Sequence, residues 1–371
     1  MRSSFAMQNM YRLLIFLLVV MMAGCLPDKP YEVVVKTYGS GKPEMVETYT
    51  GHGDKLKLQR RVEYYDNGRL RAEQFFNNGI DNGRSSKWYP NGQLKFLEFY
   101  KNGLKDSIAL YWFDNGQKGS EEHYVIGKLE GKSRTWFSNG QVSTEAYHRD
   151  GKDNGDFLRW YGNGQLMQKG QNFDDKKVGR WVYYSRNGVK ESEGDYKLDK
   201  KDGFWTFWYP NGQKRAEGHY KEGEKEGKWP FWYSNGKLVS EVYFKNGEKD
   251  GLWIEWFENG QKSFEGKYVD GKEQGLVTQW YENGQKMWQR FYIDGKENGV
   301  SITWYPSGKK STEGTFKNGI ENGRFTAWYE DGQIEFERYY TDGLQDGKST
   351  KWDHNGKVMF VEYFDKGKLR E

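Results

Sequence analysis

Residues 243–261 read Tyr243-Phe244-Lys245-Asn246-Gly247-Glu248-Lys249-Asp250-Gly251-Leu252-Trp253-Ile254-Glu255-Trp256-Phe257-Glu258-Asn259-Gly260-Gln261. Two Asn-Gly dipeptides flank a short run of aromatic and branched aliphatic side chains. Asn-Gly between such runs is typical of β-hairpins, because both residues adopt turn conformations readily. The stretch has no helical periodicity, so it predicts a strand, a turn and a second strand.

The same pattern recurs along the chain with a period of 24 residues. Asn-Gly, or a close variant, begins at Asn67, Asn91, Asn115, Asn139, Asn163, Asn187, Asn211, Asn235, Asn259, Asn283, Ser307, Asp331 and Asn355. A fixed period in this range is the signature of a repeat architecture. The sequence therefore predicts an all-β fold, an elongated antiparallel meander of about 13 tandem 24-residue β-hairpin repeats with roughly 26 short strands.

The expected boundaries follow from where this period holds. We expect the repeat array over residues 67–368. Residues 38–66 form one degenerate repeat, in which Ser40-Gly41 stands for Asn-Gly. The step from there to Asn67 is 27 residues, so a small insertion is expected after the degenerate copy.

Each repeat needs two connections. Proline precedes the Asn-Gly at Pro90, Pro210 and Pro306, which favours a three-residue hairpin with a bulge at the glycine over a two-residue type I′ turn. We expect the second connection, Lys245–Gly251, to be longer and looser. Asp175 and Asp199 replace the glycine found at Gly247 in this connection, which predicts less regular turns in the region 170–200.

Alternation along the strands assigns side chains to two faces. An aromatic residue lies three positions before each Asn: Trp88, Trp112, Trp136, Trp160, Tyr184, Trp208, Trp232, Trp256, Trp280, Trp304, Trp328 and Trp352. We expect these rings to form the core, together with the aromatic residues nine after each Asn. Glycines seven after the Asn, such as Gly194 and Gly218, are expected to make room for them.

The opposite face is expected to carry one glutamate per repeat, six after the Asn. These residues are Glu73, Glu121, Glu145, Glu193, Glu217, Glu241, Glu265, Glu313 and Glu337. A pair of carboxylates can serve glycoside hydrolysis. A carboxylate repeated in every unit is better interpreted as a solvated or cross-strand-paired surface position. The five histidines are dispersed and no nucleophile or phosphate-binding motif occurs, so no catalytic or metal site is predicted.

One group of rings departs from the uniform pattern on that second face. Four successive repeats have tryptophan six residues before the Asn, accompanied by further rings two and four positions later. The candidate interaction patch consists of Trp181, Trp205, Trp229, Trp253, Phe207, Phe231, Tyr209 and Tyr233. An exposed aromatic patch is typical of an interaction surface. The alternative is that these rings pack under a curl of the sheet or against a neighbouring copy.

The composition excludes several classes of protein. The 371 residues include 47 glycines and 18% aromatic residues, and the net charge is only +4. A nearly balanced charge gives no reason to expect nucleic-acid binding. A single cysteine excludes a disulfide scaffold and a cysteine-based zinc site.

The N-terminal 24 residues have the features of a signal peptide, with Arg12 before an apolar run of about 10 residues. The run ends in Ala23-Gly24-Cys25, which resembles the lipobox of bacterial lipoproteins. The resemblance implies cleavage before Cys25, acylation of Cys25, palmitate included, and a linker over residues 25–37. Leu26 in place of aspartate implies an outer-membrane lipoprotein of the bacterial envelope. An ordinary secretory signal with a coincidental cysteine is the alternative.

The repeat resembles the bacterial variant of the MORN repeat, on the phased glycines and the Trp-x-x-Asn-Gly segments quoted above. Some bacterial members of that family are labelled antitoxins of the YwqK type. The resemblance implies β-hairpin repeats with no cofactor and no catalysis. With the lipobox, it favours a lipid-anchored protein-binding or scaffold surface whose partner is another envelope or secreted protein. Attachment to a carbohydrate or cell-wall glycan through exposed rings and an antitoxin-like immunity role are the alternatives.

Overall fold

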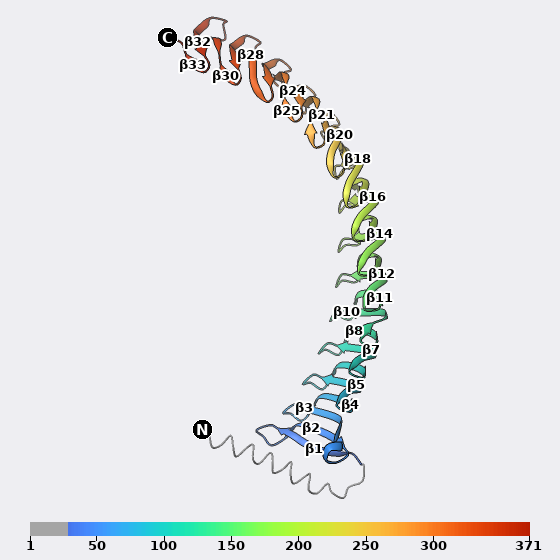
Figure 1. The fold of residues 1–371 in the computed structure, drawn as a ribbon. Helices are drawn as coiled ribbons and strands as arrows, with labels where there is room; N and C mark the ends of the chain where they lie inside the picture. The colour runs from blue at the N-terminus through green and yellow to red at the C-terminus, as the bar shows by residue number, and fades with distance from the viewer. Residues whose placement is uncertain (1–28) are drawn as a thin grey trace, which may run out of the picture. The chain divides into compact units, whose positions relative to one another are not determined.

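The computed structural model describes residues 29–371, so the expected signal peptide and Cys25 lie outside the described residues. These residues form two units, the first ending at residue 176 and the second running from 177 to 371. Within each unit, hairpins follow one another side by side in chain order (Figure 1). The pairings among the 33 described strands are antiparallel and join strands one or two places apart in the chain, which confirms the predicted all-β meander of hairpin repeats.

The described residues of the first unit, from 29 on, form one 3-10 helix and thirteen strands. They are β1 (Tyr31–Thr37), β2 (Pro43–Thr50), η2 (Gly53–Lys55), β3 (Lys57–Tyr64), β4 (Leu70–Asn77), β5 (Ile80–Trp88), β6 (Leu94–Lys101), β7 (Leu104–Trp112), β8 (Lys118–Val125), β9 (Lys128–Leu129), β10 (Gly131–Trp136), β11 (Val142–Arg149), β12 (Lys152–Trp160) and β13 (Leu166–Phe173). The short helix η2 lies between β2 and β3, at the insertion expected after the degenerate repeat.

The second unit begins within β14. Its strands are β14 (Lys176–Tyr184), β15 (Lys190–Lys197), β16 (Lys200–Trp208), β17 (Lys214–Lys221), β18 (Glu224–Trp232), β19 (Leu238–Lys245), β20 (Glu248–Trp256), β21 (Lys262–Val269), β22 (Lys272–Glu273), β23 (Gly275–Trp280), β24 (Lys286–Ile293), β25 (Lys296–Glu297), β26 (Gly299–Trp304), β27 (Lys310–Lys317), β28 (Ile320–Trp328), β29 (Ile334–Thr341), β30 (Leu344–Gln345), β31 (Gly347–Trp352), β32 (Val358–Asp365) and β33 (Lys368–Leu369).

The Asn-Gly turn has the geometry expected from the prolines. In the hairpin between β16 and β17, the N–H of Gly212 donates to the carbonyl of Tyr209 and the N–H of Tyr209 donates to the carbonyl of Gln213. Gly212 has a φ of +84°, whereas Asn211 is not in the left-handed region. This is a type I turn followed by a glycine bulge, so the three-residue hairpin is confirmed.

The second connection is tighter than expected. Lys245 pairs directly with Glu248, so the loop consists of only Asn246 and Gly247. Their φ values of +50° and +81° are those of a type I′ turn. The expectation of a long, loose connection was wrong, because the following glycine, Gly251, lies within β20 and belongs to a bulge rather than to the turn.

The type I′ turn also forms in the two repeats that have aspartate in place of the glycine at Gly247. Asp174 and Asp175 have φ values of +49° and +66°, and Leu198 and Asp199 have +51° and +69°. The turns near 170–200 are therefore as regular as the others, contrary to the expectation. Aspartate tolerates the left-handed region better than most residues because its short side chain bonds locally.

The bulge at Gly251 and at the equivalent glycines of other repeats accounts for four of the strands beyond the number expected. In four repeats it splits one arm of the hairpin in two, giving the pairs β9 and β10, β22 and β23, β25 and β26, and β30 and β31. At one such break, Gln274 donates its N–H to the carbonyl of Lys267, and Gly275 follows with a φ of +78°.

The two faces differ from the expected assignment. In the hairpin between β16 and β17, Trp208 pairs with Lys214 but Phe207 pairs with Ala216, so Arg215 is an extra residue in β17. This second bulge shifts the alternation by one residue, and every side chain beyond it changes face. The residues seven and nine after the Asn therefore share a face with those four and six before it. We call this the aromatic face, and the other the charged face.

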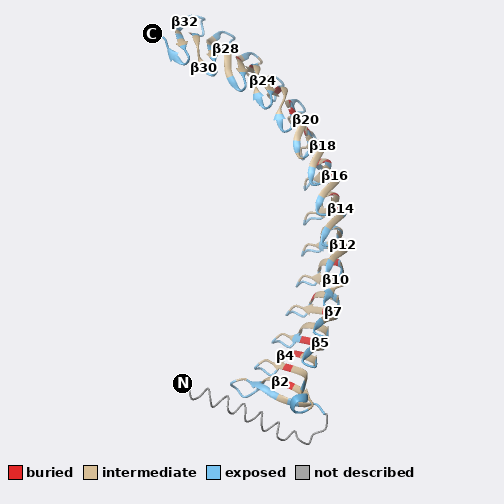
Figure 2. Cartoon of the chain, viewed as in Figure 1, coloured by how far each residue is buried: buried red, intermediate tan, exposed pale blue. Residues whose placement is uncertain are grey.

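The expected core tryptophans lie on the charged face and are only half-buried. Lysines cover several of these rings, as Lys190 does at 5.0 Å from the ring centroid of Trp208. Each of the nine glutamates on this face forms an ion pair with lysine or arginine. Five of these pairs join residues three apart on one strand, and the others join neighbouring strands. The glutamates are therefore paired as expected, although only some of the pairs cross between strands. Buried residues form short stretches within individual strands (Figure 2).

Candidate functional site

Three of the four most deeply buried side chains among residues 29–371 belong to the predicted interaction patch, and the fourth is Val277. Trp181, Trp205 and Trp229 are each only 1% exposed. They lie on the aromatic face of β14, β16 and β18. The interpretation of these three indoles as exposed anchors was wrong, and the packing alternative describes them. Fully burying a large apolar side chain contributes roughly 2–3 kcal/mol to stability.

Glycine makes this burial geometrically feasible. Gly218 pairs with Trp205 across the hairpin, and the indole of Trp229 in the next repeat lies against its Cα. A β-carbon on Gly218 would overlap that indole. Gly194 has the same relationship to Trp205. The glycines seven after the Asn therefore admit rings as expected, but they admit the tryptophans of the aromatic face.

A lysine covers each of these indoles from the solvent side. Lys225 Nζ lies 4.6 Å from the ring centroid of Trp229, 5.0 Å from Phe231 and 4.8 Å from Phe244. Lys201 Nζ lies 4.3 Å from Trp205, 4.9 Å from Phe207 and 5.0 Å from Tyr220. Such distances are those of cation–π contacts.

Two further repeats have the same arrangement at the ends of the row. Lys177 Nζ lies 4.4 Å from the Trp181 centroid and donates to Tyr183 Oη at 2.8 Å. Lys249 Nζ lies 3.1 Å from the Trp253 centroid. We call Lys177, Lys201, Lys225 and Lys249 the lysine row.

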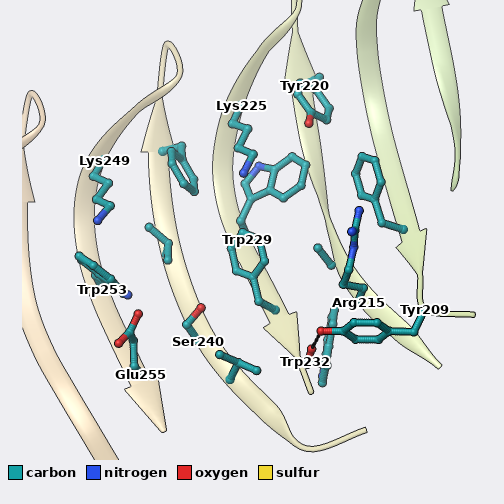
Figure 3. A pocket seen from close by; sticks show the side chains of 16 residues that line it. Tyr209, Arg215, Tyr220, Lys225, Trp229, Trp232, Ser240, Lys249, Trp253 and Glu255 are labelled. Atoms are coloured by element: carbon teal, nitrogen blue, oxygen red, sulfur yellow. Dashed lines mark hydrogen bonds between the residues drawn. The ribbon is translucent and has the colours of Figure 1, made fainter. Parts of the chain in front are cut away.

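A groove of about 610 Å³ lies along these repeats in the second unit. Its lining is Phe207, Tyr209, Arg215, Ala216, Tyr220, Lys225, Trp229, Phe231, Trp232, Val239, Ser240, Val242, Phe244, Lys249, Trp253 and Glu255. Figure 3 shows Lys225 against the indole of Trp229 on β18, with Lys249 and Trp253 on β20, beyond the intervening strand β19. We call this cavity the aromatic groove.

The aromatic groove has an excess of positive charge. Arg215, Lys225 and Lys249 line it against a single carboxylate, Glu255. Burial lowers the pKa of Lys225. Burial, and then repulsion from Lys225, lower the pKa of Lys201. Burial raises the pKa of Glu255.

Four other members of the predicted patch have distinct roles. Tyr209 Oη donates to the carbonyl of Trp232 at 2.9 Å, and Tyr233 Oη donates to that of Trp256 at 3.0 Å. Both tyrosines therefore connect one hairpin to the next. Phe207 and Phe231 are half-buried, and they provide ring surface to the aromatic groove.

Sequence reasoning missed the lysine row. A signal was present, because these lysines lie ten residues before the Asn in the same four repeats that carry the extra tryptophans. The role of these lysines depends on their position over the rings. This position was not predicted, because the assignment of side chains to the two faces was wrong by one residue.

Residues 29–371 contain no group of three or more His, Cys, Asp or Glu side chains that could hold a metal ion. Within that same range, none of the helices has the length and apolar character needed to cross a membrane.

Fold and site together define a tandem-repeat β-hairpin protein with one aromatic groove in its second unit. Seven of its segments match the family described as the MORN repeat variant: residues 60–78, 81–102, 201–222, 225–246, 249–270, 297–318 and 321–342. Each of the last five matched segments spans one hairpin around its Asn-Gly turn or the variant of it. The matches include the repeats of Lys201, Lys225 and Lys249.

Other comparisons add little. No curated protein matches the sequence. Among solved structures, the one titled "Crystal Structure of TcdB2-TccC3" is 12% identical over 90% of this chain, with a TM-score of 0.16. The one titled "Crystal Structure of TcdB2-TccC3-Cdc42" is 10% identical over 91%, also with a TM-score of 0.16. This chain spans 21% and 23% of the length of those chains.

Proposed function

We propose that this protein is a non-catalytic binding scaffold whose repeats build the aromatic groove as the contact site for a partner. The observation that supports the proposal most is the groove itself, where rings and cations from several repeats line one cavity. Concave sites lined by aromatic side chains and a few polar groups are typical ligand sites. The role needs no cofactor and no reacting group.

Anchoring through Cys25 is the second part of the proposal. Lipid on Cys25 holds the sheet at the bacterial outer membrane. The expected linker over residues 25–37 is shorter than this range, because Tyr31–Thr37 forms strand β1 and pairs with β2. Stable anchoring needs more than one acyl chain, which lipoprotein processing provides. A Cys25→Ser variant should appear in the soluble fraction of cells, whereas a variant that stays with the membrane would contradict the anchor.

Two classes of partner fit a scaffold at the envelope. The sequence favours another envelope or secreted protein, with a cell-wall glycan as the alternative. The lining of the aromatic groove supports the glycan, because sugar rings stack on aromatic side chains without needing free backbone groups. The ladder between β16 and β20 already uses the backbone groups of these strands.

Site-specific photocrosslinking in intact cells tests the proposal. A benzophenone amino acid is placed at Val239, which lines the aromatic groove, and in a second variant at Ser143. Ser143 is the matched control, since it is half-buried at the same place in a repeat of the first unit. We expect adducts at residue 239 and few at residue 143. Equal labelling at both positions would contradict the assignment of the groove as the contact site.

A further inference from the structure

The lysine row differs from the equivalent lysine of the first unit in its charge balance. Lys105 lies at the same place in its repeat, ten residues before the Asn. Its Nζ forms an ion pair with Glu98 Oε1 at 2.7 Å. Lys201 and Lys225 form no ion pair with any residue in the range 29–371. Two adjacent repeats therefore present ammonium groups that lack a counter-charge.

The packing of the tryptophans explains the missing counter-charge. Glu98 is seven residues after its Asn, and the equivalent residues beside Lys201 and Lys225 are Gly194 and Gly218. Those positions must be glycine, because a β-carbon there would overlap the indole of the next repeat. The feature that buries an indole thus also removes the carboxylate that would neutralise the lysine.

Hydrogen bonds from the next repeat hold the backbone of these two lysines in place. The N–H of Gly247 donates to the carbonyl of Lys225 at 3.0 Å, and that of Gly223 donates to the carbonyl of Lys201 at 2.8 Å. Each lysine is therefore held by the type I′ turn of the next repeat. Because each repeat contributes two strands at about 4.8 Å each, successive lysines are spaced by roughly 10 Å along the sheet.

Rings and charge together specify the chemistry of a ligand. Ring faces favour a chain of sugar rings, and an unpaired cation in each of two adjacent repeats favours a regularly placed anion. The spacing is comparable to the length of a disaccharide. An extended peptide would gain less binding free energy, because it cannot form strand-to-strand hydrogen bonds with the face of a sheet.

We propose that the aromatic groove and the lysine row bind an acidic glycan that carries one carboxylate per disaccharide. This inference rests on the proposed function, and it names the class of ligand for the same groove. Sugar rings stack on Phe207 and Phe231, while the carboxylates pair with Lys201, Lys225 and Arg215.

Binding of a hyaluronan octasaccharide, which alternates glucuronate with N-acetylglucosamine, tests the proposal in solution. The test variant is Lys201→Met/Lys225→Met, because methionine retains an apolar stem over the indole and removes the charge. Lys105→Met is the matched control, at the same repeat position in the first unit. Circular dichroism and thermal unfolding verify that each variant is folded.

We expect the unaltered protein to bind the octasaccharide, with affinity that falls as salt is added. The double variant should bind at least about tenfold more weakly, which corresponds to about 1.4 kcal/mol. The carboxyl-reduced octasaccharide should weaken binding to the same degree, and Lys105→Met should leave the affinity within about twofold.

Three results would overturn the inference: no binding by the unaltered protein, equal binding by the folded double variant, or poly-glutamate binding as tightly as the glycan. The last result would assign the groove to acidic peptides. Crosslinks at Val239 without hyaluronan binding would leave the proposed function standing and reject only the glycan. Hyaluronan binding without crosslinks at Val239 would reject the groove as the contact site in cells.

Discussion

The indole of Trp229 lies against the Cα of Gly218, in the space that a β-carbon at that residue would occupy. Gly218 does not have a positive φ, so its backbone conformation is open to any residue. The requirement for glycine at position 218 therefore comes from the neighbouring indole and not from the backbone conformation. The same relationship between Gly194 and Trp205 means that the rule holds in successive repeats.

Gly218→Ala should consequently destabilise the second unit. Overpacking a filled site costs about 1–3 kcal/mol, because the indole or the backbone has to move. Urea unfolding followed by tryptophan fluorescence measures the change. Gly162→Ala is the control, since a β-carbon there meets no atom within 4 Å. Equal stability of the two variants would show that the indole has room to shift.

Tyr209→Phe should weaken the link between consecutive hairpins. The variant loses the hydrogen bond from the hydroxyl to the Trp232 carbonyl, and we expect a loss of about 1 kcal/mol in the free energy of unfolding. Tyr147→Phe is the control, because Tyr147 is 41% exposed. If both variants unfold at the same urea concentration, the tyrosine hydroxyl contributes nothing to the contact between repeats.

Exchanging two turn sequences should move stability in opposite directions. Leu198 and Asp199 occupy a type I′ turn with positive φ, as Asn246 and Gly247 do. A residue with a β-carbon in the left-handed region costs roughly 1–2 kcal/mol, and asparagine and glycine reduce that cost.

Leu198→Asn/Asp199→Gly should therefore raise the free energy of unfolding by about 1–2 kcal/mol, and Asn246→Leu/Gly247→Asp should lower it by a similar amount. Leu198 is 51% exposed, so its replacement forfeits little packing. Thermal unfolding measures both variants. A change of the same sign in the two would contradict the turn assignment.

Acid should weaken the first unit through Glu73. Burial by itself would raise the pKa of this carboxyl, but hydrogen bonds from Arg60 and Arg84 outweigh it and the pKa is lowered. Since the pKa in the folded state lies below that of the unfolded chain, the ionised carboxylate stabilises the fold above the unfolded value of about 4.3. This stability is lost as the pH falls through the folded pKa.

The free energy of unfolding, measured from pH 6 to pH 3, should decline less steeply in Glu73→Gln than in the unaltered protein. Glu265→Gln is the control at the same repeat position, where the partner is the half-exposed Lys262. Parallel curves for Glu73→Gln and the unaltered protein would show that the two arginines do not hold this carboxylate.

The repeat, the strand class and the hairpin at Asn-Gly could be predicted because each depends on a few neighbouring residues. Pro210 and Gly212, for example, favour one turn type locally. The second turn was misjudged because Gly251 resembles a turn residue in sequence but belongs to a bulge. The faces were misassigned because the extra residue Arg215 leaves no signal in composition or spacing.

The candidate site was predictable only in part. The four tryptophans stand out in the sequence, but the burial of Trp205 and Trp229 depends on Gly194 and Gly218 of the preceding hairpins. The unpaired lysines could not be recognised, because a lysine is neutralised or left free according to a side chain in another strand. Lys105 beside Glu98 and Lys201 beside Gly194 show the two outcomes.

The sequence by itself determined the period, the all-β class and the glycine-bulged hairpin at each Asn-Gly, since steric limits on the backbone act over three or four residues. Only the tertiary structure decided which face the rings occupy, which tryptophans are buried and which cations stay unpaired. A bulge of one residue reverses the face of every side chain beyond it, and the contacts that set burial and charge join residues from different strands.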